Sequence, residues 1–432
     1  MLRAFFVSVL VGLAGCDDPA PRPAPEADRT PAGPAAPEAP APTATETAPA
    51  LEGLDGLTAA PTEDELAPRA GLSEARPDAG ACVLASETRA VLEGAGPVAL
   101  AAGADGALIV AGYTSDEAGE ALAVVRVRPD GPPALYTRIP LAGRALGRSA
   151  PPALDAGSAG LLVAATDAAG HVLVADLDLS LGAAAGRFFA ELEDAHADPR
   201  FPPLVLRAAG GVRVVAWTDG RSTPMRVRLS RFGPTGERLG TDTISPDGGG
   251  AAPVLGLGER TPGIYLVEAR VAMSAVHRVA LDEGGAPGTP EVARPLLRGA
   301  ELPSIAVARA ASGTRTHLAY AAVGNLATRA IGLVQTTGTD APAPLVPGLG
   351  YGGPITVRAA PLEGAVVFAM EAPSEAAPSA PHEVRVRLAR DDGTLGPALV
   401  LSGHRAPDVV RLGELVALGT DGARVTFLRC LE

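Results

Sequence analysis

Residues 203–236 read PLVLRAAGGVRVVAWTDGRSTPMRVRLSRFGPTG, and their pattern recurs along the chain. A proline opens a short apolar run, Gly211 leads into a second and more apolar run ending at Trp217, and the third run, 226–232, alternates arginine with other residues. Proline suits the first residue of a strand, where no ladder donor is needed, and glycine suits a tight turn. The stretch therefore predicts three consecutive antiparallel strands followed by a turn at 233–236.

Similar units fill the chain from residue 82 onward. Their opening prolines stand 50 to 55 residues apart, at Pro97, Pro152, Pro203, Pro253, Pro303, Pro354 and Pro407. Four short strands per unit, without a convincing helical period, are typical of propeller blades. Residues 82–432 therefore predict an all-β fold, a seven-bladed β-propeller. A β-sandwich or a linear β-solenoid is the alternative, because both also contain many short strands.

The two ends of this domain complement each other. The seventh unit stops after its third strand, 424–430, and residues 83–92 supply a fourth strand from the other terminus. An N-terminal strand that completes the last blade removes an open sheet edge. Cys82 and Cys430 would then be neighbours, so we expect a disulfide between them, which export would permit. Two buried free thiols are the alternative.

The unit around Trp217 also carries a motif. The run Trp217-Thr-Asp219-Gly-Arg221 resembles the Trp-x-Asp-x-Arg type of propeller repeat that is common in secreted and surface lipoproteins of bacteria. Elsewhere the resemblance shrinks to pairs such as Thr166-Asp167 and Thr420-Asp421. It implies an exported propeller protein. Kelch, WD-repeat and Asp-box patterns are absent from the sequence, and without Asp boxes a sialidase loses its best support.

Residues 1–15 read as a lipoprotein signal peptide. Arg3 precedes an apolar run that ends at Leu13, and small residues follow. The sequence LAGC at 13–16 resembles the lipobox of bacterial lipoproteins, in which the cysteine is acylated and the signal is cut just before it. The resemblance implies an acyl (palmitate) anchor at Cys16 and a place in the bacterial cell envelope. The choice between inner and outer membrane stays open, and an ordinary secreted protein is the alternative.

Residues 16–81 comprise the lipidated cysteine and a predicted tether. Residues 17–81 contain thirteen acidic residues, four arginines and no aromatic residue, with many alanines and prolines. Such a segment buries too little apolar surface to offset its ordering entropy, and its prolines favour extended polyproline II. We therefore expect a disordered, acidic, Pro/Ala-rich linker that carries most of the net charge of −13.

The composition excludes several kinds of chemistry. The chain contains no lysine, so a Schiff base, a P-loop lysine and a Ser-x-x-Lys pair are impossible. Its acidic balance argues against nucleic acid as a partner, because phosphate binding needs clustered positive charge.

The search for catalytic and metal-binding motifs yields little. The histidines are His171, His196, His277, His317, His382 and His404, and no two of them are closer than 22 residues. A Gly-x-Ser-x-Gly elbow is absent from the sequence. The run Asp176-Leu-Asp178-Leu-Ser180 resembles a calcium loop only superficially, since its alternation fits a strand. We predict no catalytic residue, no cofactor and no metal site.

An acidic residue follows the second predicted strand in six units. These residues are Asp116, Asp167, Asp219, Glu268, Glu371 and Asp421. Loops at this end of the strand lie on one propeller face near the channel mouth, so the acids could form a ring that attracts a cation or a basic partner. The alternative is that each acid stabilises its own turn by bonding nearby backbone.

These patterns predict a monomeric propeller held on the lipid bilayer through acylated Cys16. The leading function, by analogy of fold, is a non-enzymatic platform that binds an envelope protein or a glycan through loops on one face. The alternative is a propeller hydrolase or lyase that acts on polysaccharide at the channel mouth, with two carboxylates as acid and base. The aromatic content of 3% disfavours a cleft that stacks on sugars.

Overall fold

The computed structural model describes residues 81–93, 96–117, 119–141, 143–145, 147, 150–157, 160–177, 188–269, 274–295, 307–312, 315–323, 329–337, 343–350, 356–373 and 382–430. The predicted signal peptide, Cys16 and the predicted tether lie outside these residues. Among the described residues, we find no helix that is long and apolar enough to cross a membrane.

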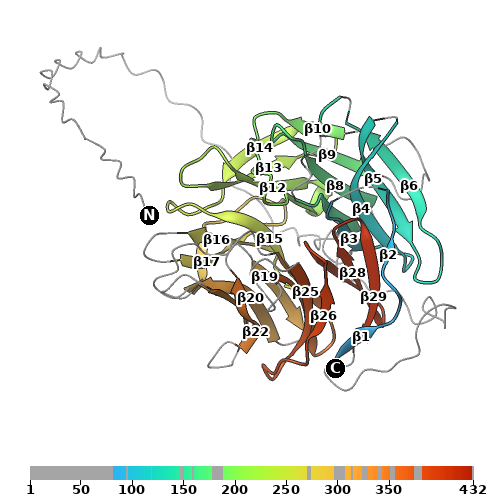
Figure 1. The fold of residues 1–432 in the computed structure, drawn as a ribbon. Coiled ribbons are helices and arrows are strands. Elements are labelled where there is room, and N and C mark those ends of the chain that lie inside the picture. The colour runs from blue at the N-terminus through green and yellow to red at the C-terminus, as the bar shows by residue number, and fades with distance from the viewer. Residues whose placement is uncertain are drawn as a thin grey trace, which may run out of the picture. The chain divides into compact units, whose positions relative to one another are not determined.

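The described strands form antiparallel units arranged as a β-propeller (Figure 1). The inner strands are β3 (Ala99–Ala102), β7 (Ala153–Gly157), β11 (Leu204–Arg207), β15 (Ala251–Leu257), β19 (Val307–Ser312), β23 (Val357–Pro361) and β27 (Asp408–Leu412). The second strands are β4 (Leu108–Asp116), β8 (Gly160–Thr166), β12 (Arg213–Asp219), β16 (Gly263–Ala269), β20 (Arg315–Val323), β24 (Ala365–Pro373) and β28 (Leu415–Thr420).

Two further strands follow in most units. The third strands are β5 (Gly119–Val127), β9 (Val172–Leu177), β13 (Arg226–Phe232), β17 (Ser274–Ala280), β21 (Arg329–Thr336), β25 (His382–Arg390) and β29 (Arg424–Cys430). The outer strands are β6 (Ala134–Pro140), β10 (Phe188–Leu192), β14 (Arg238–Thr243), β18 (Glu291–Pro295), β22 (Ala343–Gly350) and β26 (Leu399–Ser402). A short 3-10 turn, Ala209–Gly211, connects β11 to β12.

The predicted number of seven separate blades is corrected to six sheets. Five sheets contain four or five strands, and the sixth contains eight, in the order β18-β17-β16-β15-β19-β20-β21-β22. The two inner strands of this sheet, β15 and β19, pair in parallel at Gly256 with Arg309 and at Leu257 with Ala310. These hydrogen bonds join two antiparallel units into one eight-stranded sheet, a blade of double width. The sequence pattern within either unit does not predict this pairing.

Four of the five described opening prolines lie shortly before a strand. Pro152, Pro203 and Pro407 directly precede β7, β11 and β27, and Pro97 lies two residues before β3. Pro253 lies inside β15, where the register shifts between Ala251 and Val254. A bulge leaves a residue unpaired in the ladder, so the missing N–H of proline is tolerated there. Pro303 and Pro354 lie outside the described residues.

The first described strand lies beside the last one (Figure 1). Strand β1 (Cys82–Leu84) pairs antiparallel with β29, with Cys82 opposite Cys430, and β2 (Arg89–Ala90) pairs with the other end of β29. Cys82 and Cys430 are joined by a disulfide, with their Cα atoms 4.1 Å apart. The bond links residues separated by 348 positions in the sequence.

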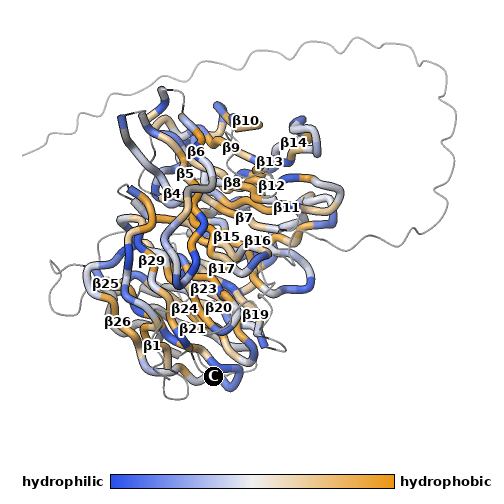
Figure 2. Tube along the Cα trace, turned by 90° about the vertical axis from the view of Figure 1, so that its right-hand side faces the viewer, coloured by the Kyte–Doolittle hydropathy of each residue, from blue (hydrophilic) through white to orange (hydrophobic). Residues whose placement is uncertain are grey.

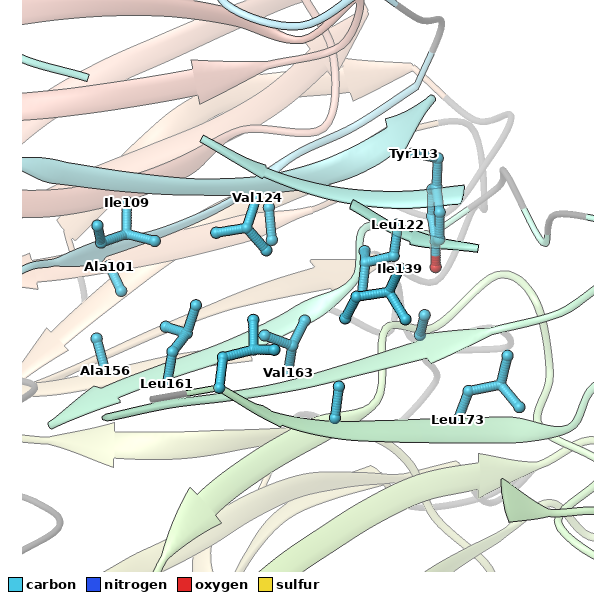
Figure 3. Packing of buried hydrophobic residues seen from close by; sticks show 14 of the residues in the cluster. Ala101, Ile109, Tyr113, Leu122, Val124, Ile139, Ala156, Leu161, Val163 and Leu173 are labelled. Atoms are coloured by element: carbon cyan, nitrogen blue, oxygen red, sulfur yellow. The ribbon is translucent and has the colours of Figure 1, made fainter. Parts of the chain in front are cut away.

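The hydrophobic core lies between neighbouring sheets. Figure 3 shows Ile109 and Val124 of one sheet facing Leu161 and Val163 of the next. All seven residues of β8 are buried, because sheets cover both faces of this strand. This explains why the second run of each unit is the most apolar one in the sequence.

The outer strands have a different pattern. Strand β14 is exposed or half-buried throughout, and exposed large hydrophobic residues are found on outer strands, as at Leu239, Val292 and Val400. Figure 2 shows the most hydrophobic segments in the middle of the sheets and the most hydrophilic ones at hairpin tips. The strands therefore become more exposed and less hydrophobic from the centre of the propeller outward.

Candidate functional site

The acids predicted to form a ring lie at or near the ends of the second strands. Asp219 ends β12, Asp167 and Asp421 directly follow β8 and β28, and Glu268 and Glu371 lie near the ends of β16 and β24. Asp167, Asp219, Glu268 and Glu371 are buried. Asp116 ends β4, and its side chain lies outside the described part of the structure.

Asp167 is held by its own turn and by a neighbouring arginine. Its Oδ1 accepts hydrogen bonds from the backbone N–H groups of Ala169 and His171, both at 2.9 Å. Its Oδ2 lies 2.8 Å from Nδ1 of His171 and 3.3 Å from Nη1 of Arg144. Burial opposes ionisation of Asp167, but the hydrogen bonds from His171 outweigh it and hold the pKa below its ordinary value.

Two glutamates pair with histidines across their hairpins. Glu268 Oε2 lies 2.6 Å from His277 Nε2, and Glu371 Oε1 lies 2.6 Å from His382 Nδ1. Glu268 is opposite Ala275 in the ladder, so His277, two residues further, projects from the same face of the sheet. Glu371 also accepts a hydrogen bond from the backbone of Ala406 at 2.8 Å.

The other two described acids bond mainly to backbone and nearby side chains. Asp219 accepts from the N–H of Arg221 at 2.9 Å and from the hydroxyl of Ser222 at 3.1 Å. Asp421 accepts from the N–H of Arg405 at 2.9 Å. Each of the five described carboxylates thus has a partner within its own or the adjacent unit. That they attract a cation or a basic partner stays a prediction.

The pairing of acids with histidines was missed in the sequence. Each histidine taken alone gives no sign of this pairing, whereas its position across a hairpin from an acid does. The signal was available, because the number of residues between acid and histidine sets their register once the turn is known. Among the described residues, no three His, Cys, Asp or Glu side chains are placed to hold a metal ion.

A serine, a histidine and an aspartate also meet, but not as a catalytic triad. Nε2 of His317 lies 3.0 Å from the hydroxyl of Ser312 and 3.1 Å from Oδ1 of Asp391, and the same Oδ1 accepts from Ser312. Nδ1 lies 2.9 Å from the hydroxyl of Thr336. Burial lowers the pKa of His317. Ser312 and Asp391 both lie against Nε2, whereas a catalytic triad places the serine and the aspartate at opposite nitrogens of the ring.

Asp176, considered above as part of a calcium loop, is held by arginines instead. It forms ion pairs with Arg207 and Arg213, and the latter contact measures 2.5 Å. Burial opposes its ionisation, but these two guanidinium groups lower its pKa. Asp178 and Ser180 lie outside the described residues.

The centre of the propeller contains a cavity of about 170 Å³. Residues from all of the inner strands line it, from Ala99 on β3 to Val410 on β27, together with the proline pairs 151–152 and 202–203 at the strand openings. The lining is mostly alanine, proline, valine and leucine. The charged residues among the described lining are Arg309, Arg358 and Asp408.

Asp408 is already engaged by backbone. Its Oδ2 accepts from the N–H of Leu100 at 2.7 Å, which ties β27 to β3, and its Oδ1 accepts from the N–H of Val409 at 3.0 Å. Nε of Arg358 lies 3.8 Å from Oδ1. Burial raises the pKa of Asp408, and Arg358 opposes this shift in part.

Arg309 is neutralised by a residue outside the cavity. Its Nε donates to Oε1 of Glu259 at 2.9 Å, and its guanidinium lies 5.5 Å from the centre of the Tyr265 ring. Tyr265 donates its hydroxyl to the same glutamate at 2.6 Å. Nothing in the local sequence of Arg309, Arg358 or Asp408 marks them as cavity residues.

The chain was compared with protein-family models, with curated proteins and with solved structures. No protein-family model matches the chain, and no curated protein matches it. Among solved structures, it is similar to AofleA from Arthrobotrys oligospora, with 14% identity, a TM-score of 0.46, and coverage of 77% of this chain and 93% of that one. For the polysaccharide lyase Uly1, the identity is 8%, the TM-score 0.45, and the coverage 87% of this chain and 97% of that one. For the β-propeller domain of the Trilobed protease from Pyrococcus furiosus, the identity is 10%, the TM-score 0.41, and the coverage 78% of this chain and 93% of that one.

Proposed function

We propose that this protein is a lipoprotein of the bacterial cell envelope whose propeller serves as a non-enzymatic binding platform. Acylated Cys16 anchors it to the bilayer, residues 16–81 form the tether, and the loops on one propeller face bind an envelope protein or a glycan. The resemblance of residues 13–16 to a lipobox supports the anchor. The platform rests on the chemistry of the cavity.

The composition of the cavity wall carries this proposal. Hydrolysis of a glycosidic bond requires a pair of carboxyl groups, about 5 to 10 Å apart, that act as acid and base or nucleophile. The described cavity lining contains a single carboxyl group, Asp408, and both of its oxygens accept backbone hydrogen bonds. An apolar wall with one engaged acid supports binding rather than hydrolysis.

The closed ring belongs to the same proposal. Strand β1 completes the last blade, and the disulfide between Cys82 and Cys430 fastens it. The antiparallel pairing of β1 with β29 supports this closure. A closed ring leaves no unpaired edge at the junction of the two ends, which favours a monomer.

Fractionation of cells tests the anchor. The wild-type chain is expected in the membrane pellet and to incorporate labelled palmitate, whereas Cys16→Ser is expected to lose the label and leave the pellet. The matched control is Cys82→Ser with Cys430→Ser, which removes two cysteines but keeps the predicted acylation site. Labelling of Cys16→Ser at the wild-type level would overturn the anchor.

An assay of polysaccharide degradation tests the platform. The protein is incubated with polysaccharides isolated from bacterial envelopes, and new reducing ends and unsaturated uronates are measured. We expect retention of a ligand on immobilised protein without release of either product. Turnover that Asp408→Asn abolishes would replace the platform with the polysaccharide enzyme.

A further inference from the structure

The axial cavity contains an arginine that is incompletely paired. Nη1 of Arg358 donates to the carbonyl of Val357 at 3.0 Å, and Nε is 3.8 Å from Asp408, which is beyond hydrogen-bond distance. Among the described residues, no hydrogen-bond partner is found for Nη2. A guanidinium carries five donors in a planar fork, so most of its capacity is unused.

This guanidinium is half-buried. Burial lowers the pKa of Arg358 and raises that of Asp408, while 23% of the Arg358 side chain and 19% of the Asp408 side chain stay exposed. A guanidinium keeps its proton in proteins, so the positive charge stays. Arg309, the other lining arginine, is already paired with Glu259. The unused hydrogen-bond donors of the cavity therefore belong to Arg358, whose charge faces Asp408 at 3.8 Å without a direct hydrogen bond.

We propose that the axial cavity binds a small monoanion with an apolar body, such as a short-chain or aromatic carboxylate, through the guanidinium of Arg358. The carboxylate would accept two parallel hydrogen bonds from the fork of the guanidinium. The hydrocarbon part would lie against the wall formed by residues such as Leu154, Val254 and Val410. This site is separate from the loop face of the proposed platform.

The volume limits the ligand. A cavity of about 150 Å³ lined by apolar side chains accommodates benzene, so the 170 Å³ here suits a molecule of roughly six to ten non-hydrogen atoms. A glycan chain or a peptide cannot lie wholly within it. A neutral alcohol of the same length would fill the apolar part but leave the guanidinium unpaired.

Calorimetric titration of the full chain carrying Cys16→Ser tests the proposal. Hexanoate and benzoate serve as probes for chain and ring, and hexan-1-ol is the neutral control. We expect one carboxylate per protein and weaker binding of the alcohol, by about tenfold or more, because a hydrogen bond to a charged group is lost. Equal affinity for hexanoate and hexan-1-ol, or no binding of either carboxylate at millimolar concentration, would overturn the proposal.

Variants assign the binding to this cavity. Arg358→Met, which keeps length but removes charge, is expected to weaken hexanoate binding by about tenfold to a hundredfold. Arg390→Gln removes a half-buried arginine outside the cavity lining and should change nothing. Unchanged affinity in Arg358→Met contradicts the assignment.

Two further variants keep the test valid if Arg358→Met does not fold. Val254→Trp fills the cavity while leaving Arg358 in place, and it is expected to abolish binding of both carboxylates. Asp408→Asn retains an acceptor for Leu100 but removes the neighbouring negative charge, so hexanoate should bind more tightly. Wild-type affinity in Val254→Trp, or weaker binding in Asp408→Asn, would refute an anion site at Arg358. The platform is tested separately and would survive either result.

Discussion

Asp155 is a fully buried carboxyl group whose removal should change how stability depends on pH. It lies on β7, and its Oδ2 accepts a hydrogen bond from the backbone of Arg207 at 2.8 Å, while Oδ1 is buried without a hydrogen-bond partner in the described structure. Burial raises its pKa from 3.8 to about 7, and the backbone hydrogen bond and the charge of Arg207 only partly oppose this. The perturbation is Asp155→Asn, which keeps an acceptor for Arg207 and has no charge to desolvate.

The direction in which stability changes with pH follows from the difference in proton binding between the folded and the unfolded state. In the unfolded chain Asp155 ionises above pH 3.8, whereas in the folded protein it stays protonated until about pH 7. The folded state therefore binds more protons between these values, and its contribution to stability falls as pH rises through this window. With 1.36 kcal/mol for each pKa unit, the loss between pH 4.5 and pH 8.5 is about 3 kcal/mol.

Urea unfolding at a series of pH values measures this contribution. The chain contains one tryptophan, Trp217, which is buried and reports unfolding by fluorescence. Relative to wild type, Asp155→Asn should gain about 3 kcal/mol of unfolding free energy between pH 4.5 and pH 8.5. The difference between the two proteins cancels the titration of other groups.

The control is Asp247→Asn, an exposed carboxyl in the turn before β15. This substitution removes a surface carboxylate without changing the interior. An offset added to the pH-dependent change would mean that the amide also packs differently. A difference between Asp155→Asn and wild type that varies by less than about half a kcal/mol across the range, whatever its size, would refute the view that Asp155 is protonated in the folded protein.

Three further predictions concern stability. Cys82→Ser with Cys430→Ser opens a loop of 348 positions and should lower the unfolding free energy by up to about 5 kcal/mol in urea titrations followed by circular dichroism; no loss would contradict a staple between the ends. Trp217→Phe removes a buried hydrogen bond of 2.7 Å to a backbone carbonyl and should cost about 1 to 3 kcal/mol in the same assay. Gly160→Ala places a methyl group 2.5 Å from a carbonyl oxygen at a φ of +120° and should lower the melting temperature, whereas Gly157→Ala, with open space around it, should not; similar melting temperatures would refute the steric argument.

The order of the strands within each unit could be predicted from the spacing of prolines, glycines and apolar runs in the sequence. Hairpins form between runs adjacent in the sequence, so Gly106, Gly160 and Gly364, which adopt positive φ, mark turns that need no distant contact. The partnership of Cys82 and Cys430 followed from the same count, because a unit without a fourth strand requires one from elsewhere. The blade number did not follow, because hydrogen bonds between β15 and β19 depend on how closely two units approach.

The candidate site could be predicted from the sequence only in part. The acids near the second-strand ends were located by sequence, but their histidine and backbone partners depend on the register of each hairpin and on loops from neighbouring units. Arg358 is one of 36 arginines in the chain, and its neighbouring residues do not distinguish it. Its significance arises from the lack of a full set of hydrogen-bond partners, which is a property of the surroundings.

The sequence by itself therefore determined the all-β repeat, the position of its turns and the complementarity of its ends, because alternation, glycine and proline act within a few residues. The tertiary structure decided that two units merge into one wide blade and that an apolar cavity retains one poorly paired guanidinium. Both depend on strands about 50 residues apart in the chain, whose separation and solvation are fixed only when the inner strands assemble around the axis.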